Sequence, residues 1–252
     1  MKLKNKSVVI TGASSGMGKA IVERFAQEGT NIIAVARRKE RLDALADSLK
    51  DAPGKVIPFA GDVSREETMV NAIDLAVKEF GCLDILVNNA GIMDDMSPIG
   101  DVQNEKIDQV FAVNVYGPMY AMRKAVQVFR EQGNGGNIIN VASVGAMKTV
   151  AGAVYCASKA AVISLSKNTA FMYMPEGIRC NVIAPGGIAT EISASMGMPN
   201  MAGYSRVKNV LAAAPAPGSA EQIAGAALFL ASEDSSYVNG DVLTVDGGWA
   251  AG

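Results

Sequence analysis

Three tyrosines each stand four residues before a lysine, a spacing that puts both side chains on one face of a helix. A free phenol has a pKa of about 10, which is too high for efficient proton transfer near neutral pH. A neighbouring ammonium group favours the phenolate and lowers that pKa. Such a pair could therefore exchange a proton with a hydroxyl or carbonyl oxygen. The three pairs are Tyr120–Lys124, Tyr155–Lys159 and Tyr204–Lys208.

The surrounding sequence favours Tyr155 over the other two tyrosines. Tyr120 lies deep inside a predicted helix, and Tyr204 lies in an irregular segment. Tyr155 opens a helix and follows, by twelve residues, Ser143, which ends the predicted strand Asn137–Ala142. Ligands of α/β proteins bind at such strand ends. Ser143 could donate a hydrogen bond to a substrate oxygen as charge develops on it. The alternative is an ordinary turn serine.

Asn114 stands among apolar residues inside the predicted helix Glu105–Gln132. Asparagine is a poor helix former, and burying its amide without partners costs free energy. It is therefore either a core amide with satisfied hydrogen bonds or a residue that holds a water and returns protons toward Lys159. The sequence leaves both alternatives open.

A glycine-rich segment lies between the first predicted strand and a helix, with Gly12, Gly16 and Gly18 in the spacing G-x-x-x-G-x-G. Glycine lets the backbone approach a phosphate without a Cβ clash. The helix that follows offers unpaired N–H groups and a positive dipole end. The segment lacks the Gly-Lys-Ser/Thr of a P-loop. It indicates a dinucleotide site, the alternative being an ordinary glycine turn.

The second predicted strand ends at Ala36 and is followed by Arg37 and Arg38. Dinucleotide-binding folds often place an acid here for the adenine ribose, whereas an arginine accepts a 2′-phosphate. The two arginines favour NADP(H) over NAD(H), unless they are only the solvated start of the next helix. After the third strand, Ser64-x-x-Glu67 predicts a capping box. Asp62 is not needed for that cap and is free to face an adenine.

Positioning these residues requires an alternation of strands and helices, and the chain shows one over its whole length. Such alternation predicts a parallel sheet covered by helices on both faces. The sequence therefore indicates an α/β fold: one doubly wound, Rossmann-type domain over residues 1–252 with a seven-stranded parallel sheet. The segment 186–217 has no clean period and is expected to form a substrate-binding lid. The predicted strands are Ser7–Thr11, Asn31–Ala36, Val56–Ala60, Ile85–Asn89, Asn137–Ala142, Arg179–Ala184 and Val242–Val245. The predicted helices are Lys19–Gly29, Glu40–Leu49, Glu66–Phe80, Glu105–Gln132, Val154–Met174 and Ala220–Ser232.

Composition excludes several kinds of site and partner. The chain contains no histidine, which excludes a Ser-His-Asp triad and any histidine-ligated metal site, so no metal is expected. A net charge of -2 gives no field that would recruit nucleic acid or an anionic membrane. No stretch near the N-terminus is long and apolar enough for a signal peptide or a membrane span. Three unpaired cysteines suit a reducing compartment, and a cytoplasmic location is expected.

These motifs, taken in order, resemble the classical short-chain dehydrogenase/reductase family over essentially the whole chain. The matching pieces are Thr11–Gly18, Asp62, Asn88–Gly91, Asn114, Ser143, Tyr155–Lys159, Pro185–Gly186 and Val245–Gly248. The resemblance implies that Tyr155 is the general acid/base, that Lys159 lowers its pKa, that Ser143 orients the carbonyl and that Asn114 supports a proton relay. It also implies a set of residues that bind the dinucleotide. These are Gly12, Ser14, Ser15, Gly16, Met17, Gly18, Arg37, Arg38, Asp62, Val63, Asn89, Ala90, Gly91, Tyr155, Lys159, Ile188 and Thr190.

The resemblance leaves the substrate open, since one fold hosts many activities. Methionines in the 186–217 segment suit a bulky apolar ligand such as a hydroxysteroid, unless they only pack the lid onto the domain. A small ketone is equally compatible. A 3-oxoacyl-[acyl-carrier-protein] reductase is a further alternative, although the stretch 170–176 lacks positive charges to dock an acidic carrier and carries Glu176. A protein that senses NADP(H) without turnover is an alternative of another class.

Apolar residues cover every face of one predicted helix end, which is too much apolar surface to leave in solvent. They are Phe171, Met172, Tyr173 and Met174. In the family that this chain resembles, this helix and the one around Asn114 pack against a neighbouring subunit. We therefore expect a homotetramer or a homodimer.

Overall fold

The computed structural model describes residues 1–252 and contains a seven-stranded parallel sheet in the order β3-β2-β1-β4-β5-β6-β7. Short β-branched runs form these strands, and most of their residues are buried on both faces of the sheet. The strand order reverses between β1 and β4, which opens a crevice at their carboxyl ends. This arrangement confirms the predicted fold class. The strands are β1 (Ser7–Thr11), β2 (Asn31–Ala36), β3 (Val56–Ala60), β4 (Ile85–Asn88), β5 (Gly136–Val141), β6 (Ile178–Pro185) and β7 (Val242–Val245).

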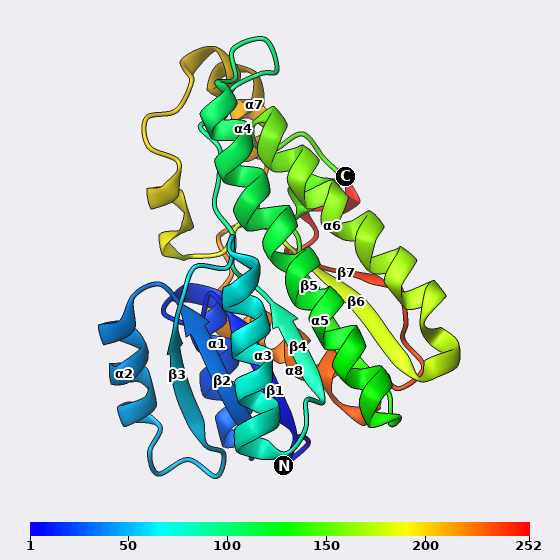
Figure 1. Cartoon of the computed structure of the whole chain (residues 1–252). Coiled ribbons are helices and arrows are strands. Elements are labelled where there is room, and N and C mark those ends of the chain that lie inside the picture. The colour runs from blue at the N-terminus through cyan, green and yellow to red at the C-terminus, as the bar shows by residue number, and fades with distance from the viewer.

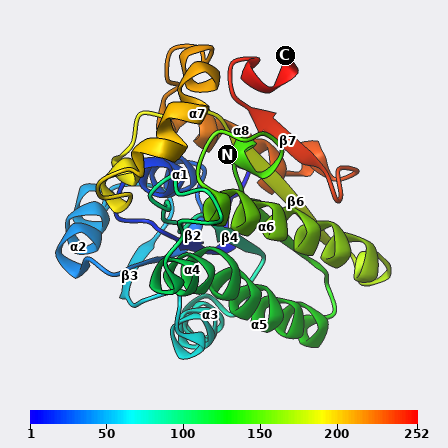
Figure 2. The same cartoon turned by 90° about the horizontal axis from the view of Figure 1, so that it is seen from above.

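Helices cover both faces of the sheet, as Figures 1 and 2 show. On one face, α1 and α8 pack together with α2 over the largest core cluster, which includes Phe25, Leu42 and Leu228. On the other face, α3, α5 and α6 cover a second cluster around Met69 and Phe129. None of the helices is both long and apolar enough to cross a lipid bilayer. The helices are α1 (Gly16–Gln27), α2 (Lys39–Ser48), α3 (Glu66–Phe80), α4 (Asn104–Phe111), α5 (Gly117–Gln132), α6 (Ala153–Met172), α7 (Met201–Ala212) and α8 (Ala220–Ala231).

A π turn divides the helix that the sequence predicts as continuous over residues 105–132. The turn spans Ala112–Tyr116 between α4 and α5, with Asn114 at its centre. Gly117 starts α5 against the loop after β3, where an added Cβ would lie 2.9 Å from the carbonyl oxygen of Val63. π turns are rare and are frequent at functional sites. Here the turn carries a buried amide toward the crevice, a detail that a 3.6-residue period cannot reveal.

The segment 186–217 contains more regular structure than the sequence predicts. It forms a 3₁₀ turn at Glu191–Ser195 and the helix α7, which stands beyond the sheet at the top of Figure 1. Gly203 lets α7 contact the loop after β4, because a Cβ there would lie 1.9 Å from the carbonyl oxygen of Met96. Met198 is 91% exposed and Met201 is 68% exposed. These two methionines therefore do not pack the segment onto the domain.

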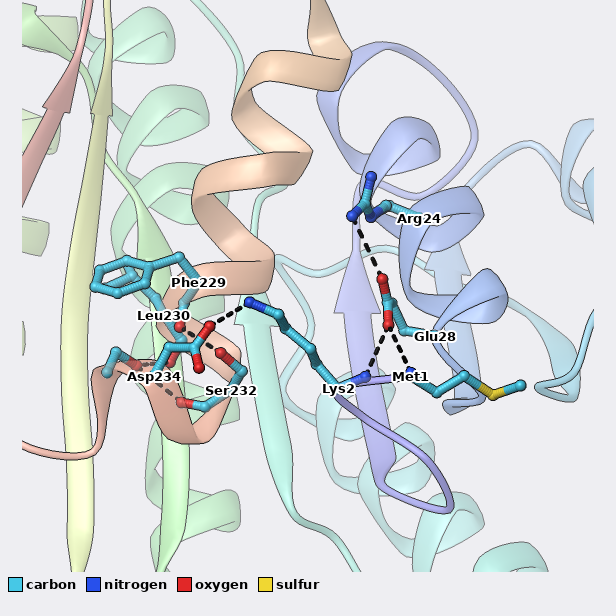
Figure 3. Close-up of polar contacts among 9 residues, drawn as sticks. Met1, Lys2, Arg24, Glu28, Phe229, Leu230, Ser232 and Asp234 are labelled. Atoms are coloured by element: carbon cyan, nitrogen blue, oxygen red, sulfur yellow. Dashed lines mark hydrogen bonds and ion pairs between the residues drawn. The ribbon is translucent and has the colours of Figure 1, made fainter.

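The N-terminal residues join α1 to the turn after α8 (Figure 3). The Glu28 carboxylate accepts a hydrogen bond of 2.7 Å from the backbone N–H of Lys2 and lies 3.3 Å from the Arg24 guanidinium. The Lys2 ammonium group pairs with Asp234. Both ion pairs lie at the ends of α1 and α8 that are remote from the glycine segment. They take no part in the crevice.

Candidate active site

A cavity of about 380 Å³ opens at the crevice between β1 and β4. The structure brings most of the predicted dinucleotide-binding residues to its wall, from the ends of four strands and from the 186–217 segment. These lining residues are Gly12, Ser14, Ser15, Gly16, Met17, Arg37, Arg38, Asp62, Val63, Asn89, Ala90, Gly91 and Thr190. Gly18, Ile188, Tyr155 and Lys159 do not line this part of the cavity.

The glycine segment forms a cradle that side chains would fill. Gly12 has a φ of 69°, and a Cβ there would lie 2.7 Å from Asn89 Nδ2. A Cβ on Gly18 would lie 2.2 Å from the carbonyl oxygen of Gly12, so Gly18 serves the close packing of α1 against the loop. The N-cap residue of α1, Ser15, makes no side-chain capping hydrogen bond. The first N–H groups of α1 therefore remain available to an anion, which fits a pyrophosphate and disfavours an ordinary turn.

Asn89 presents a second feature that fits a dinucleotide. Its Nδ2 donates to the carbonyl oxygen of Thr11 at 3.0 Å, and its backbone N–H donates to Thr11 Oγ1 at 3.0 Å. Its Oδ1 is buried and has no hydrogen-bond partner in the protein. Unpaired buried acceptors are rare in folded proteins and call for a donor. A hydroxyl group of a bound ribose has the chemistry to satisfy this oxygen.

The predicted capping box at Ser64 and Glu67 is wrong. Helix α3 starts at Glu66 with Arg65 as its N-cap and without a side-chain cap. The Ser64 hydroxyl instead donates to Asp62 Oδ1 at 2.8 Å, and the Ser64 backbone N–H donates to the same oxygen at 3.0 Å. Partial burial of Asp62 raises its pKa, but these hydrogen bonds and the nearby arginines outweigh it and hold the pKa below its usual value. Asp62 is therefore an ionised acceptor at the cavity wall.

Arg38 lies half-exposed at the cavity mouth, with its guanidinium against the glycine segment. Its Nη2 donates to Ser15 Oγ at 2.8 Å and to Ser14 Oγ at 3.3 Å. It is thus more than the solvated start of α2, because it adds positive charge where the cradle already favours an anion. Sequence reasoning missed its other partner, Glu191, which also lines the cavity.

Ile188, which the resemblance implies binds the dinucleotide, is not among the residues that line this cavity. Its backbone forms a parallel bridge with Gly218, and its side chain packs against the core cluster of α1 and α8. Thr190, two residues later, does line the cavity and lies against Gly16. The bridge to Gly218 sets which residues of this segment face inward, and it depends on a contact 30 positions away in the chain.

The predicted proton-transfer groups come together at the start of α6. Tyr155 is 7% exposed and its ring lies close to the Ser143 side chain, since both come within 3.4 Å of the position that a Cβ on Gly145 would take. Ser143 Oγ also accepts the backbone N–H of Gly145 at 3.0 Å, so the same hydroxyl caps a 3₁₀ turn. Lys159 Nζ lies 5.8 Å from the centre of the Tyr155 ring and donates to the carbonyl oxygen of Val141 at 3.0 Å. Ser143 can therefore be both a turn serine and a hydrogen-bond donor to a substrate oxygen.

The other two Tyr–Lys pairs are engaged elsewhere. Lys124 forms an ion pair with Asp74 at 2.6 Å, and the Tyr120 ring faces Arg123 rather than a cavity. Tyr204 is 40% exposed on α7. Only the pair on α6 combines burial with a neighbouring hydroxyl group.

Burial controls the protonation of Tyr155 and Lys159 in the protein by itself. It raises the pKa of Tyr155 to about 12, against the opposing effect of the neighbouring Ser143 side chain. It lowers the pKa of Lys159 to about 8. The expected lowering of the phenol pKa is therefore absent in the protein alone, because desolvation is the largest influence on it. A bound nicotinamide would accept hydride in its oxidised, cationic form, which also adds positive charge, and would supply hydride in its reduced, neutral form.

The side-chain amide of Asn114 is buried and has its hydrogen bonds satisfied within the protein. Its Nδ2 donates to the carbonyl oxygen of Ile92 at 2.9 Å and to Ser158 Oγ at 3.0 Å, and its Oδ1 accepts the N–H of Ile92 at 2.9 Å. Ser158 lies between Tyr155 and Lys159 on α6. Asn114 thus ties the loop after β4 to the helix that carries both groups.

Asp94 is a positioning residue that sequence reasoning missed. Its carboxylate is fully buried and accepts backbone N–H groups from Tyr155 at 2.8 Å and from Gly152 and Met96 at 3.1 Å. It caps the N-terminus of α6 from a distant loop, where a negative charge is favoured. Gly152 leaves room for it, because a Cβ there would lie 2.4 Å from the carboxylate oxygens. No sequence motif links positions 94 and 152.

Changing Asp94 to Asn is expected to destabilise the fold by about 1–2 kcal/mol and to lower kcat. The amide has only one acceptor oxygen, so its NH₂ group must face an N–H donor of α6. Urea unfolding and steady-state kinetics measure the two effects. Asp95→Asn is the matched control, because Asp95 accepts only one N–H, from Ser97 at 3.2 Å. Equal stability of the two variants would contradict this role.

Comparisons with known proteins agree with this geometry. A family model described as enoyl-(acyl carrier protein) reductase matches residues 12–250. The chain is 43% identical to a 3beta-hydroxysteroid dehydrogenase 2 of Eggerthella lenta, over 99% of this chain and 96% of that protein. It is 37% identical to a 3-oxoacyl-[acyl-carrier-protein] reductase of Thermotoga maritima, over 98% of this chain and 99% of that protein.

A solved structure of a short-chain dehydrogenase from Burkholderia cenocepacia, in complex with NADP, superposes with a TM-score of 0.86 at 30% identity, over 99% of both chains. Similarity of this extent covers the cradle, the Ser143–Tyr155–Lys159 group and the sheet alike. The chain therefore belongs to the classical short-chain dehydrogenase/reductase family and is an oxidoreductase that acts on CH–OH groups with a nicotinamide dinucleotide.

Proposed function

We propose that this enzyme interconverts a bulky apolar secondary alcohol, such as a hydroxysteroid, and its ketone, and that it prefers NADP(H) to NAD(H). The observation that carries the proposal is the buried Tyr155 side chain, which lies beside Ser143 and Lys159 and next to a cavity lined by the glycine segment. The 43% identity to a 3beta-hydroxysteroid dehydrogenase supports the substrate class. Arg38, against the two serines of the cradle, supports the preference for a 2′-phosphate.

The residues divide the proton chemistry among them. The phenol of Tyr155 donates its proton to the carbonyl oxygen in reduction, or accepts the hydroxyl proton in oxidation. The Ser143 hydroxyl orients that oxygen by a hydrogen bond. Lys159, held by the carbonyl of Val141, stabilises the phenolate by its charge. Asn114 ties the loop after β4 to α6 and so fixes the helix that carries Tyr155 and Lys159.

A 3-oxoacyl-[acyl-carrier-protein] reductase is the second candidate, favoured by the relative from Thermotoga maritima. An acidic carrier protein would need a basic surface near the active site. At the end of α6, Glu176 pairs with Arg130 at 2.7 Å, which leaves a neutral pair instead of a positive patch. We therefore rank this candidate below the hydroxysteroid.

Reductase assays with NADH and NADPH test the proposal. The panel contains 3-ketosteroids, small cyclic ketones and a 3-oxoacyl thioester, and the absorbance of the reduced nicotinamide reports turnover. We expect kcat/KM to be highest for a steroid with NADPH. A higher value for the thioester would select the second candidate. Binding of NADPH without turnover on any carbonyl would indicate a sensor instead of an enzyme.

We also propose that the end of α6 is a subunit interface of a homodimer or homotetramer. Phe171 is 74% exposed, and Met172 and Met174 are each 59% exposed, on one turn of surface. Changing Phe171 to Glu is expected to shift the protein toward smaller species, because a charge cannot be buried there without a partner. Size-exclusion chromatography with light scattering measures the mass. Ile99→Glu, at a loop residue that is 77% exposed, is the control. A monomeric wild-type protein would contradict the proposal.

A further inference from the structure

Glu191 lies between two arginine side chains at the mouth of the cavity. Its carboxylate accepts hydrogen bonds from Arg41 Nη1 at 2.9 and 3.1 Å and from Arg38 Nη1 at 3.2 Å. The arginines belong to the start of α2, whereas Glu191 begins the 3₁₀ turn of the 186–217 segment. These contacts therefore join that segment to the second strand–helix unit across 150 positions of the chain.

The two arginines form an anion site that a carboxylate of the same chain already occupies. Arg38 also donates to the hydroxyls of Ser14 and Ser15, so two guanidinium groups and two hydroxyls converge near one point. Arginine forks bind phosphate and carboxylate with the same geometry. Hydrogen bonds from both arginines hold the pKa of Glu191 below its usual value, so the carboxylate is ionised.

The contact is weak enough to be exchanged. The side chains of Glu191, Arg38 and Arg41 are 56%, 44% and 47% exposed, and exposed ion pairs contribute little to stability. A phosphate monoester carries close to two negative charges and three acceptor oxygens, against one charge and two oxygens for a carboxylate. A 2′-phosphate that reaches these arginines therefore binds them more strongly than the Glu191 carboxylate does.

We propose that Glu191 is a latch that responds to the 2′-phosphate of the coenzyme: its carboxylate holds the 186–217 segment against Arg38 and Arg41 until the 2′-phosphate of NADP(H) displaces it. A dinucleotide without this phosphate leaves the latch closed. The inference rests on the proposed function, because it assumes that the adenosine half of the coenzyme lies in this cavity. It adds that Glu191 weakens NADP(H) binding and couples it to release of the segment.

Binding of two coenzyme fragments tests the latch without any turnover. Isothermal titration calorimetry compares adenosine 2′,5′-bisphosphate with 5′-AMP for wild type, Glu191→Gln and Glu40→Gln. Glu40 is the matched control, since it is an exposed acid on α2 without a hydrogen bond to either arginine. We expect the ratio of the two affinities to rise about fivefold in Glu191→Gln, the effect of removing an exposed ion-pair competitor. An unchanged ratio, or an equal rise in Glu40→Gln, overturns the proposal.

Hydrogen exchange on the wild-type protein tests the latch should Glu191→Gln fold poorly. Peptides covering 188–195 are expected to exchange faster with the bisphosphate than with 5′-AMP bound, because only the former releases Glu191. Equal or slower exchange overturns the latch. Turnover on the carbonyl panel is independent of both measurements. An active enzyme without these differences would refute the latch alone, whereas loss of turnover on every carbonyl would refute the proposed function.

Discussion

Replacing Tyr155 with Phe is expected to lower kcat by about a thousandfold, the size of the contribution that a positioned general acid or base makes. The phenyl ring keeps the packing of a side chain that is only 7% exposed, so the fold and the cavity persist. The hydroxyl beside Ser143 is lost, and with it the group that would exchange the proton. Steady-state kinetics on the best ketone and NADPH titration by fluorescence measure activity and binding separately.

Tyr204→Phe is the matched control for this variant, because Tyr204 also precedes a lysine by four residues but lies 40% exposed on α7. We expect its kcat to stay close to that of the wild-type enzyme. A Tyr155→Phe variant with nearly full activity would show that another group moves the proton. A variant that loses NADPH binding as well would show a structural role instead.

Replacing Lys159 with Met is expected to abolish most activity and to stabilise the protein by about 2 kcal/mol at pH 7. Burial lowers the pKa of Lys159 from 10.5 to about 8, which means that the folded protein disfavours the charged ammonium. At about 1.4 kcal/mol for each pKa unit, burial of the charged ammonium group costs the folded protein about 3 kcal/mol. Loss of the hydrogen bond to Val141 offsets about 1 kcal/mol of the gain.

The pH dependence of stability checks the cause of this effect. Below pH 8 the lysine is protonated in both the folded and the unfolded state, so the buried charge lowers the free energy of unfolding by its full amount. Between about 8 and 10.5 the folded protein has lost the proton and the unfolded chain retains it. The free energy of unfolding of the wild type therefore rises with pH over this range, relative to Lys159→Met.

Tyr155 has the opposite effect at higher pH. Its pKa is raised from 10.0 to about 12, so the unfolded chain loses the proton first and stability falls above pH 10. The difference in urea unfolding between wild type and Lys159→Met from pH 7 to 9.5 isolates the lysine, because the cysteines, whose pKa values burial raises, contribute equally to both proteins. Lys124→Met, which removes a lysine paired with Asp74, is the control and should keep the wild-type slope. A Lys159→Met variant that is less stable than wild type at pH 7 would refute this account.

Much of the fold and of the site could be predicted from the sequence because it depends on local patterns. Short β-branched runs that alternate with amphipathic segments require a parallel sheet covered on both faces, and the seven strands lie where these patterns indicate. The glycine spacing predicts the cradle because glycine has no Cβ, so the residue types alone show where the backbone is open to a ligand. The i, i+4 spacing of Tyr155 and Lys159 likewise requires only one turn of helix.

The tertiary structure decided what depends on residues that are distant in the chain. Asp94 caps α6 across 61 positions, and Glu191 reaches Arg41 across 150. Ile188 turns away from the cavity because its backbone pairs with Gly218. The pKa of Tyr155 rises because packing removes water from the phenol, a quantity that no spacing of residues encodes. The sequence thus determined which groups can do the chemistry, while their burial and their long-range partners set the charge that each one carries.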